Sequence, residues 1–354
     1  MRILHVSNFG DKHNGRLYWN QCFKISNGFI RNGHNVYNFS DRDRSRSSIF
    51  NKFKNNESVQ NELIQTIENY NPNLIVLGHA DRINIETLSK IRAKKDIKVI
   101  EWNVDNFYLD NTANKLLNRS KYLDGIFSTT AGEQISECVS DNFISFFPNI
   151  VDSSIESMKI YENTNHPKDV FFALSHGVGT GKLRKKNSLN ENKDPRVKFM
   201  DNLKCDLSDV KFSFFGMRGV QPIWASDFDN IIKDCYMGIC LQRKPILKYS
   251  LSDRISQYLG NGLMVFIESD TQYYDILKKD EEAVYFDDLE DLEKKIIFYK
   301  NNKKKALEIA AMGHKKIHHA CNEKVVTKYM LDCLNNHSIE NLNSSYNWPV
   351  NLYK

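Results

Sequence analysis

The sequence predicts an α/β fold made of two halves, each with a parallel sheet covered by helices. Short apolar strands alternate with segments whose apolar residues recur at helical spacing, the order that gives parallel sheets with crossover helices. This order restarts near residue 169. The length of 354 residues also exceeds the usual size of a single hydrophobic core. We therefore expect two Rossmann-like domains that face each other across a cleft, with ligands at the carboxyl ends of the strands.

Helix limits in the first half can be read from the residues. Leu17, Cys22, Ile25 and Phe29 recur at helical spacing over residues 17–32, and Asn32-Gly33 ends this helix. A helix over 57–70 ends before Pro72, and another is expected near 84–94. The apolar runs between the helices predict strands over residues 3–6, 35–39, 74–77, 98–102, 125–128 and 143–146.

The segment 148–152 resembles a crossing between domains. We therefore place the first domain at residues 1–150, the second at 151–335 and a C-terminal tail at 336–354, which we expect to be irregular. Strands of the second domain are expected at 169–174, 211–215, 236–241 and 265–267. Its helices are expected at 196–204, 226–233, just before Gly260, and at 288–300, 303–319 and 323–335, with a charged loop at 179–195.

The composition, with 41% hydrophobic and 26% charged residues, is that of a folded soluble protein, and the irregularly spaced cysteines are typical of reduced thiols in a cytoplasmic protein. The net charge of +5 is spread over many loops and forms no basic and aromatic stripe, so a nucleic-acid partner is not expected. The seven cysteines form neither a C-x-x-C pair nor a cluster of metal-ligand spacing. No apolar run reaches the ~18–20 residues of a membrane span, although a peripheral contact with the inner face of the membrane stays open.

One polar loop has the composition of a phosphate site. Lys248, Ser252, Asp253 and Arg254 lead into a short helix that breaks at Gly260-Asn261-Gly262 and is followed by an apolar strand. Backbone donors at a helix start and a guanidinium fork both favour a dianion. The Lys-rich loop with Lys182, Arg184, Lys185 and Lys186 is a second candidate, for which a merely solvated loop is the competing interpretation.

Residues 252–335 resemble the C-terminal half of GT-B glycosyltransferases, in particular the CgeB-like group. The shared pattern consists of Ser252-Asp-Arg254, Gly262, the strand 265–267, the acidic segment 287–292 and Ile309-Ala-Ala-Met-Gly313. The first strand, the loop at 8–16 and the helix ending at 30–36 also resemble the first unit of such enzymes. Where the family carries a glutamate for the donor ribose, this chain has Gln257, which leaves the nucleotide open.

This resemblance implies that the chain transfers a sugar from a nucleotide-sugar donor to a glycan or lipid-linked acceptor, in surface polysaccharide assembly. It implies the nucleotide-sugar as co-substrate and no obligatory cofactor or metal. A loop at residues 14–16 is expected to complete the phosphate pocket through Asn14, Gly15 and Arg16. The residues expected to bind the donor are Ser175, His176, Gly177, Lys182, Arg184, Gly216, Gln221, Pro222, Lys248, Tyr249, Ser252, Asp253, Arg254 and Gln257.

Candidate bases for the acceptor hydroxyl follow predicted strands of the first half, namely Asp43, His79, Asp81 and Asp105. Each of them is also compatible with a salt-bridged loop. His79 and Asp105 are favoured, because an apolar strand and the neighbouring Trp102 would desolvate them. Asp41 and Asp43 have D-x-D spacing, but basic groups are expected to neutralise the phosphates, so we expect no metal.

Two other functions fit the same sequence. A nucleotide-sugar epimerase or hydrolase of this fold would consume the donor without an acceptor. A catalytically silent nucleotide- or glycan-binding protein is compatible with Gln257. In the silent protein, substitution of His79 or Asp105 would change stability only.

Overall fold

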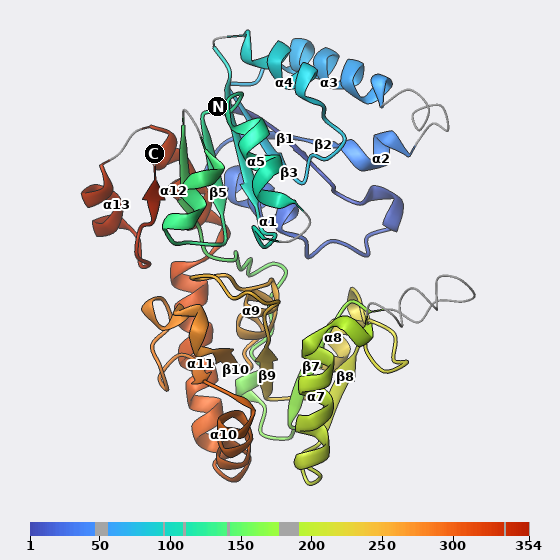
Figure 1. The fold of residues 1–354 in the computed structure, drawn as a ribbon, viewed down its shortest axis with the longest axis vertical. Helices are drawn as coiled ribbons and strands as arrows, with labels where there is room; N and C mark the ends of the chain where they lie inside the picture. Colours follow the sequence, from blue (N-terminus) through green and yellow to red (C-terminus); the bar gives the residue numbers. More distant parts are fainter. Residues whose placement is uncertain are drawn as a thin grey trace. The chain divides into compact units, whose positions relative to one another are not determined.

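The computed structural model describes residues 1–46, 56–94, 96–108, 111–139, 142–176, 191–335 and 338–353. Its contacts divide the chain into two compact units (Figure 1). The first unit comprises Met1–Ile150 together with Cys321–Lys354, and the second comprises Val151–Ala320. Each unit is an α/β structure with its own parallel sheet. The predicted α/β class with two parallel sheets is therefore confirmed.

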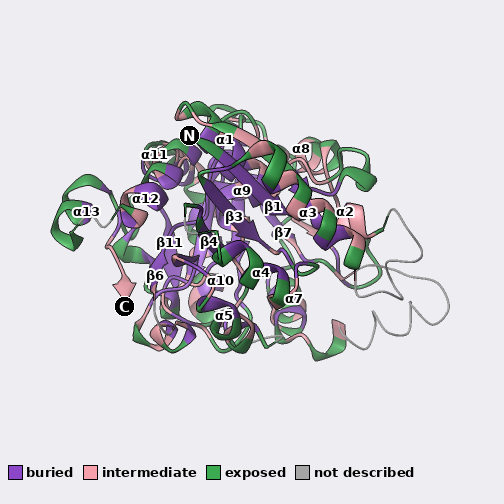
Figure 2. Cartoon of the chain, turned by 90° about the horizontal axis from the view of Figure 1, so that it is seen from above, coloured by how far each residue is buried: buried purple, intermediate pink, exposed green. Residues whose placement is uncertain are grey.

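The sheet of the first unit has the order β12-β6-β5-β4-β3-β1-β2. All neighbours pair in parallel except β12, which runs antiparallel along the edge strand β6. The central strands β1, β3 and β4 are almost entirely buried, as Figure 2 shows for β1 and β3. The strands are β1 (Arg2–Ser7), β2 (Asn35–Ser40), β3 (Leu74–Gly78), β4 (Lys98–Asn103), β5 (Gly125–Ser128), β6 (Phe143–Phe146) and β12 (Leu352–Tyr353).

The sheet of the second unit is parallel throughout, with the order β11-β10-β9-β7-β8. Its first strand, β7, lies between the second and the third, so the chain changes direction across the sheet between β7 and β9. Ligands in such sheets bind at this switch point, beyond the carboxyl ends of the strands. The strands are β7 (Val170–Ala173), β8 (Phe212–Phe215), β9 (Met237–Cys240), β10 (Met264–Glu268) and β11 (Val284–Phe286).

Side-chain caps define where several helices begin. Asn84, Asp194, Asp288, Asn322 and Ser338 each accept a hydrogen bond from a backbone amide of the helix that follows. The helices of the first unit are α1 (Gln21–Arg31), α2 (Asp41–Ser45), α3 (Glu57–Tyr70), α4 (Ile85–Arg92), α5 (Thr112–Ser120), α12 (Glu323–Leu334) and α13 (Ile339–Ser345). Those of the second unit are α7 (Pro195–Asp206), α8 (Ser226–Ile232), α9 (Arg254–Gly260), α10 (Leu289–Asn301) and α11 (Lys303–Ala320).

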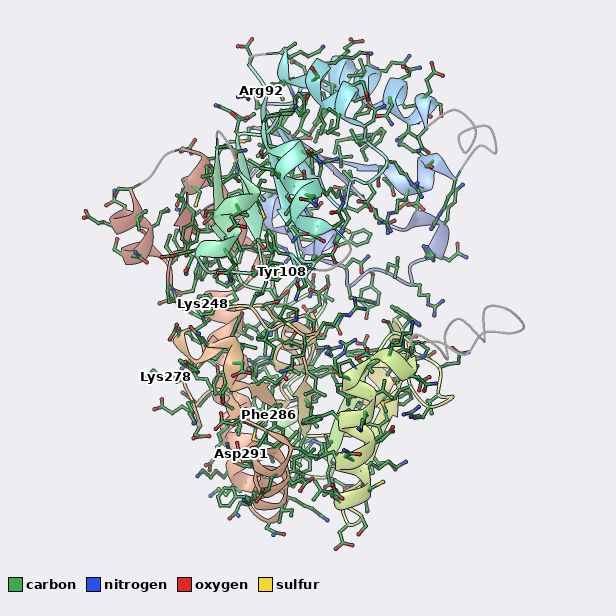
Figure 3. The ribbon with its side chains drawn as sticks, in the orientation of Figure 1. Arg92, Tyr108, Lys248, Lys278, Phe286 and Asp291 are labelled. Atoms are coloured by element: carbon green, nitrogen blue, oxygen red, sulfur yellow. The ribbon has the colours of Figure 1, made fainter. Side chains whose placement is uncertain are left out.

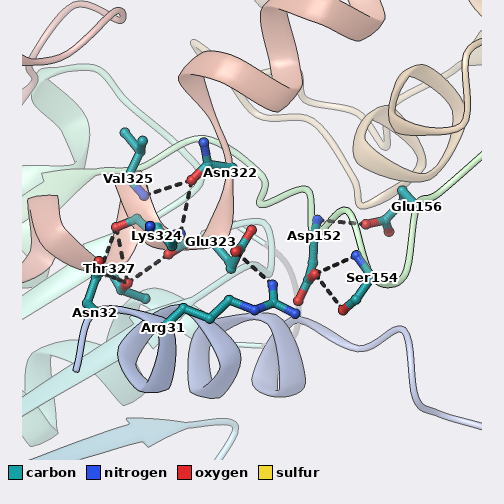
Figure 4. A network of polar contacts seen from close by, with 10 residues as sticks. All are labelled: Arg31, Asn32, Asp152, Ser154, Glu156, Asn322, Glu323, Lys324, Val325 and Thr327. Carbon is teal, nitrogen blue, oxygen red and sulfur yellow. Dashed lines mark hydrogen bonds and ion pairs between the residues drawn. The ribbon is translucent and has the colours of Figure 1, made fainter. Parts of the chain in front are cut away.

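Helix α12 belongs to the first unit, which corrects the sequence-based domain limit at residue 335. It lies along α1, where Arg31 forms a 2.7 Å ion pair with Glu323 (Figure 4). Asn32 Nδ2 donates to the backbone oxygen of Lys324 at 2.8 Å and to Thr327 Oγ1 at 3.0 Å. Helical periodicity identified the helix but contains no information about which sheet it covers.

The segment that opens the second unit folds into a local turn, also drawn in Figure 4. Asp152 Oδ1 accepts hydrogen bonds from the backbone amide and the hydroxyl of Ser154, at 2.9 and 2.7 Å. The Asp152 amide in turn donates to Glu156 Oε2 at 2.9 Å. Such side-chain bonds to the backbone stabilise a turn without regular secondary structure.

The predicted irregular tail is wrong, because residues 339–345 form α13 and residues 352–353 form β12. Trp348 is buried beside Tyr329 and Tyr346, with ring centroids 5.2 Å from each. An aromatic cluster therefore attaches this segment to α12.

The sequence analysis also left out α2 and α5, which are short and polar.

None of the seven cysteines, all within the described ranges, forms a disulfide. In the part of the chain that the structure describes, no helix is long and apolar enough to cross a membrane.

The α1–α12 contact depends on Gly28. A Cβ atom at this position would lie 2.2 Å from the backbone oxygen of Glu323 and 2.7 Å from Thr327 Cγ2. Helix propensity alone would make Gly28→Ala stabilising by about 1 kcal/mol. We expect the opposite sign, a destabilisation of about 1–3 kcal/mol, because α12 must move away.

Chemical denaturation would measure this change. Ile30→Ala is the control on the same helix, since Ile30 is 51% exposed and its truncation should change stability little. A stabilised Gly28→Ala variant would contradict the close approach of the two helices.

Candidate functional site

Arg254 lies at the switch point of the second sheet. Its Nη1 donates to the backbone oxygen of Ala173, the last residue of β7, at 3.3 Å. Its Nη2 donates to the backbone oxygen of Leu241, directly after β9, at 2.6 Å. Both partners are neutral carbonyl groups. The guanidinium therefore bridges the two strand ends without forming an ion pair with a described residue.

Three buried polar atoms around Arg254 have no hydrogen-bond partner among the described residues. They are Arg254 Nε, Ser252 Oγ and Gln242 Nε2. Two other hydrogen bonds orient Gln242. Its side-chain oxygen Oε1 accepts from the backbone amide of Ser252 at 3.1 Å, and its backbone amide donates to Glu268 Oε2 at 2.6 Å. All three atoms can donate, and unsatisfied buried donors are rare in folded proteins.

Burial lowers the pKa of Arg254, because the charged form loses solvation. An arginine nevertheless stays protonated at neutral pH. A half-buried cation whose own Nε and two neighbouring donor atoms lack partners favours an anionic ligand with several acceptor oxygens, such as a phosphate. Gln242 was missed by the sequence analysis, although its position directly after an apolar strand is a signal for a ligand-facing residue.

His176 follows β7 and is held by Asp194. Its Nε2 lies 2.9 Å from Asp194 Oδ2, and Arg196 Nη2 donates to the same oxygen at 2.6 Å. Burial alone would raise the pKa of Asp194, but the bonds from Arg196 and His176 keep that pKa well below its usual range. Asp194 also begins α7 as its cap. The sequence analysis selected His176 but missed Asp194 and Arg196.

The loop before α9 contains both half-buried and buried candidates. Lys248, labelled in Figure 3, is half-buried with its Nζ 4.9 Å from the centre of the Tyr249 ring. Tyr249 is buried and its hydroxyl donates to Asp275 Oδ2 at 2.6 Å, which indicates a structural role. Asp253 and Gln257 are half-buried at the start of α9.

The loop after β8 shows why Gly216 is a glycine. A Cβ atom there would lie 1.8 Å from the backbone oxygen of Leu174, and its φ of +69° is left-handed. Gly216 therefore permits close backbone packing. Ser175 and Gln221 are exposed and Pro222 is half-buried. The remaining predicted donor residues, Gly177, Lys182 and Arg184, lie outside the described residues.

In the first unit, the structure brings the two favoured bases together. His79 follows β3 and Asp105 follows β4, and His79 Nδ1 lies 3.4 Å from Asp105 Oδ2. The Asn103 side chain holds the backbone of Asp105: Asn103 Nδ2 donates to the Asp105 backbone oxygen at 2.7 Å, and the Asp105 backbone amide donates to Asn103 Oδ1 at 3.3 Å. The His79 ring stands edge-on to Trp102, with centroids 5.4 Å apart and planes at 90°.

The other two base candidates are engaged elsewhere. Asp81 pairs with Arg42 and Lys115, and these partners outweigh the effect of burial and lower its pKa to about 2. A carboxylate so stabilised is a poor base at neutral pH. Asp43 is buried and accepts from the backbone amides of Asp11 and Lys12, at 2.8 and 3.3 Å.

The D-x-D spacing has a structural explanation. Asp41 is buried, with its two oxygens accepting the backbone amides of Arg42 and Arg82 at 2.8 and 3.0 Å. Asp43 holds the loop after β1, as described above. The end of this loop, Asn14, Gly15 and Arg16, is exposed, with left-handed φ at Asn14 and Gly15.

Comparisons with known proteins support these assignments of fold. Residues 196–331 match the model of the glycosyl transferase-like family. A search among proteins of curated function finds no match. HepE from Anabaena, solved with UDP and glucose, is 11% identical with a TM-score of 0.58 over 95% of this chain and 100% of that one. Sucrose-phosphate synthase from Thermosynechococcus elongatus is 10% identical, with a TM-score of 0.59 over 95% and 98% of the two chains.

A glycosyltransferase from Rickettsia africae is similar to the same extent, with 12% identity and a TM-score of 0.55 over 95% and 99% of the chains. These structural likenesses establish the two-domain fold, and the family match adds the activity. The chain is a glycosyltransferase of the GT-B fold, and its residues 196–331 match the model of the glycosyl transferase-like family.

Proposed function

We propose that this enzyme uses a UDP-sugar as donor and binds its phosphates through Arg254, Ser252 and Gln242. The observation that carries the proposal is the group of three buried, unpartnered donor atoms at the switch point of the second sheet. The complex of HepE with UDP and glucose supports the choice of nucleotide. Gln257 takes the place of the family glutamate and can still bind a ribose hydroxyl through its amide oxygen.

The chemistry needs a stabilised leaving group. When the glycosidic bond to phosphate breaks, negative charge grows on the leaving UDP. Fixed donors that already point at this position stabilise the charge without reorganisation. Arg254 suits this role because its guanidinium is held in place by the carbonyl groups of Ala173 and Leu241.

The second part of the proposal concerns the acceptor hydroxyl. His79 accepts its proton on Nε2, while Asp105 faces Nδ1 and orients the ring. The His79 side chain is 28% exposed and that of Asp105 is 60% exposed, so both are accessible. Neither Asp43 nor Asp81 takes part in this proposal, because their oxygens serve the loop and ion-pair contacts described above.

We further propose a glycan or lipid-linked acceptor, used in surface polysaccharide assembly at the cytoplasmic face of a membrane. Helix α5 and the segment before it support a peripheral membrane contact. Tyr108, labelled in Figure 3, is 56% exposed, and Leu117 is 41% exposed. Lys121 is exposed at the end of the same helix. Exposed apolar side chains next to a lysine suit an anionic lipid surface.

The donor site can be tested by thermal unfolding with UDP and UDP-glucose. A ligand at about 100 times its dissociation constant should add roughly 2.7 kcal/mol of stability. Arg254→Ala should abolish this shift, because it removes the cation and the bridge between the strand ends. Arg92→Ala is the control, since Arg92 is an exposed arginine paired with Asp124. An Arg254→Ala protein that unfolds cooperatively and keeps the full UDP shift would refute the assignment.

The base can be tested by UDP release from UDP-glucose, with lipid extracts and free glycans as acceptors. His79→Ala should lower kcat by about 10²–10⁴-fold, the usual contribution of a general base. Asp105→Asn should lower kcat less, since it alters only the orientation of the ring. Asp81→Asn is the matched control and should retain activity. Equal activity of the His79 variant and the unaltered enzyme would exclude this base.

We also expect activity without divalent metal ions. Asp41 and Asp43 use their oxygens for backbone amides, and Arg254 supplies positive charge for the phosphates. Excess EDTA should therefore leave the rate of UDP release unchanged. A loss of activity that Mg²⁺ or Mn²⁺ restores would show that a metal is required.

A further inference from the structure

A hydrogen-bonded chain runs from Trp102, which contacts the His79 ring, through buried His5 and Ser26 to exposed Asn38. The indole N–H of Trp102, on β4, donates to His5 Nε2, on β1, at 3.0 Å. His5 Nδ1 lies 2.8 Å from Ser26 Oγ on α1, and that hydroxyl donates to Asn38 Oδ1 on β2 at 2.8 Å. The chain therefore joins β4, β1, α1 and β2 of the first unit.

The protons of this chain have one consistent arrangement. Because His5 Nε2 accepts from Trp102, its single proton lies on Nδ1 and is donated to Ser26. The ring must be neutral, since a protonated imidazole has no acceptor. Burial lowers the pKa of His5 to about 3, in agreement with a neutral ring at physiological pH.

Gly78 makes the contact between Trp102 and His5 possible. Strand β3 lies between β1 and β4, so the indole must cross it to reach His5. Gly78 of β3 is the direct neighbour of Trp102, and a Cβ atom there would lie 1.9 Å from Trp102 Cε2. The residue that follows Gly78 is His79, whose φ of +49° is left-handed. The crossing indole thus lies where the chain turns out of the sheet.

We propose that Trp102 and His5 are positioning residues for His79. The bond to His5 fixes the plane of the indole, and the His79 ring stands edge-on to that plane with its Nδ1 toward Asp105. Trp102 itself is 3% exposed, so the indole has few other orientations available. This inference rests on the proposed role of His79 as the base.

Ordinary core packing would need only the apolar body of Trp102. It would not need an indole N–H aimed at a neutral histidine two strands away, nor a glycine at the crossing. The packing role and the positioning role therefore predict different effects for a variant that removes the hydrogen bond between Trp102 and His5 but keeps the side-chain volume. A packing role predicts a loss of stability alone, and a positioning role predicts a change at His79.

The experiment compares His5→Leu, His5→Gln and Trp102→Phe in the full-length protein. Leucine has no acceptor for the indole, whereas glutamine places an amide oxygen near the position of Nε2. Tyr329→Phe is the matched control, because it removes another buried bond of the first unit, 2.6 Å from Tyr329 to Ser145. The readouts are kcat and KM for UDP-glucose, the pH profile of kcat, and the His79 ring signals in NMR spectra of protein labelled with ¹⁵N-histidine.

We expect His5→Leu and Trp102→Phe to lower kcat about ten- to hundredfold, with KM for UDP-glucose unchanged. Both should shift the acidic limb of the kcat profile and move the His79 signals. His5→Gln should restore most of the activity, and Tyr329→Phe should change none of these readouts. In a His79→Ala background, His5→Leu should cause no further loss of kcat.

The positioning role is overturned if His5→Leu and Trp102→Phe lower the unfolding temperature as Tyr329→Phe does but leave kcat and the His79 signals unchanged. A different result would contradict the proposed base instead. If His79→Ala keeps full activity, His79 is not the base. The His79 NMR signals of the Trp102→Phe and His5→Leu proteins would still show whether Trp102 orients the His79 ring.

Discussion

A half-buried arginine whose hydrogen-bond partners are neutral is the constraint on which the proposed donor site depends. Arg254 is held by the carbonyl ends of β7 and β9, which are adjacent only because the strand order reverses between them. Burying a cation is costly unless a counter-charge compensates it. Because the described residues satisfy only part of the guanidinium, we propose that an anionic ligand provides the remaining partner.

The fold could be predicted well from the sequence wherever burial sets a period. Strand 74–78 is a continuous apolar run, and α3 has clear limits at residues 57 and 70. The assignment of α12 to the first unit could not be predicted, since the helical spacing of its apolar residues is compatible with packing in either unit. The position of α12 is determined by contacts between residues distant in sequence, among them the Arg31–Glu323 ion pair and the close approach at Gly28.

Strand ends predicted the region of the site but not the roles within it. His79 and Asp105 follow neighbouring strands, and the register of β3 and β4 accounts for their proximity. Asp81 looked equivalent in the sequence, yet Lys115 of a helix that was not predicted neutralises it. Gln242 and Asp194 were missed because an amide after a strand and a capping aspartate are common in structural roles as well.

A crystal structure of the enzyme with UDP bound would test the central claim most directly. We expect phosphate oxygens within hydrogen-bond distance of Arg254 Nε, Ser252 Oγ and Gln242 Nε2, at the ends of β7 and β9. Phosphates bound elsewhere, with these three atoms still unpartnered, would contradict it.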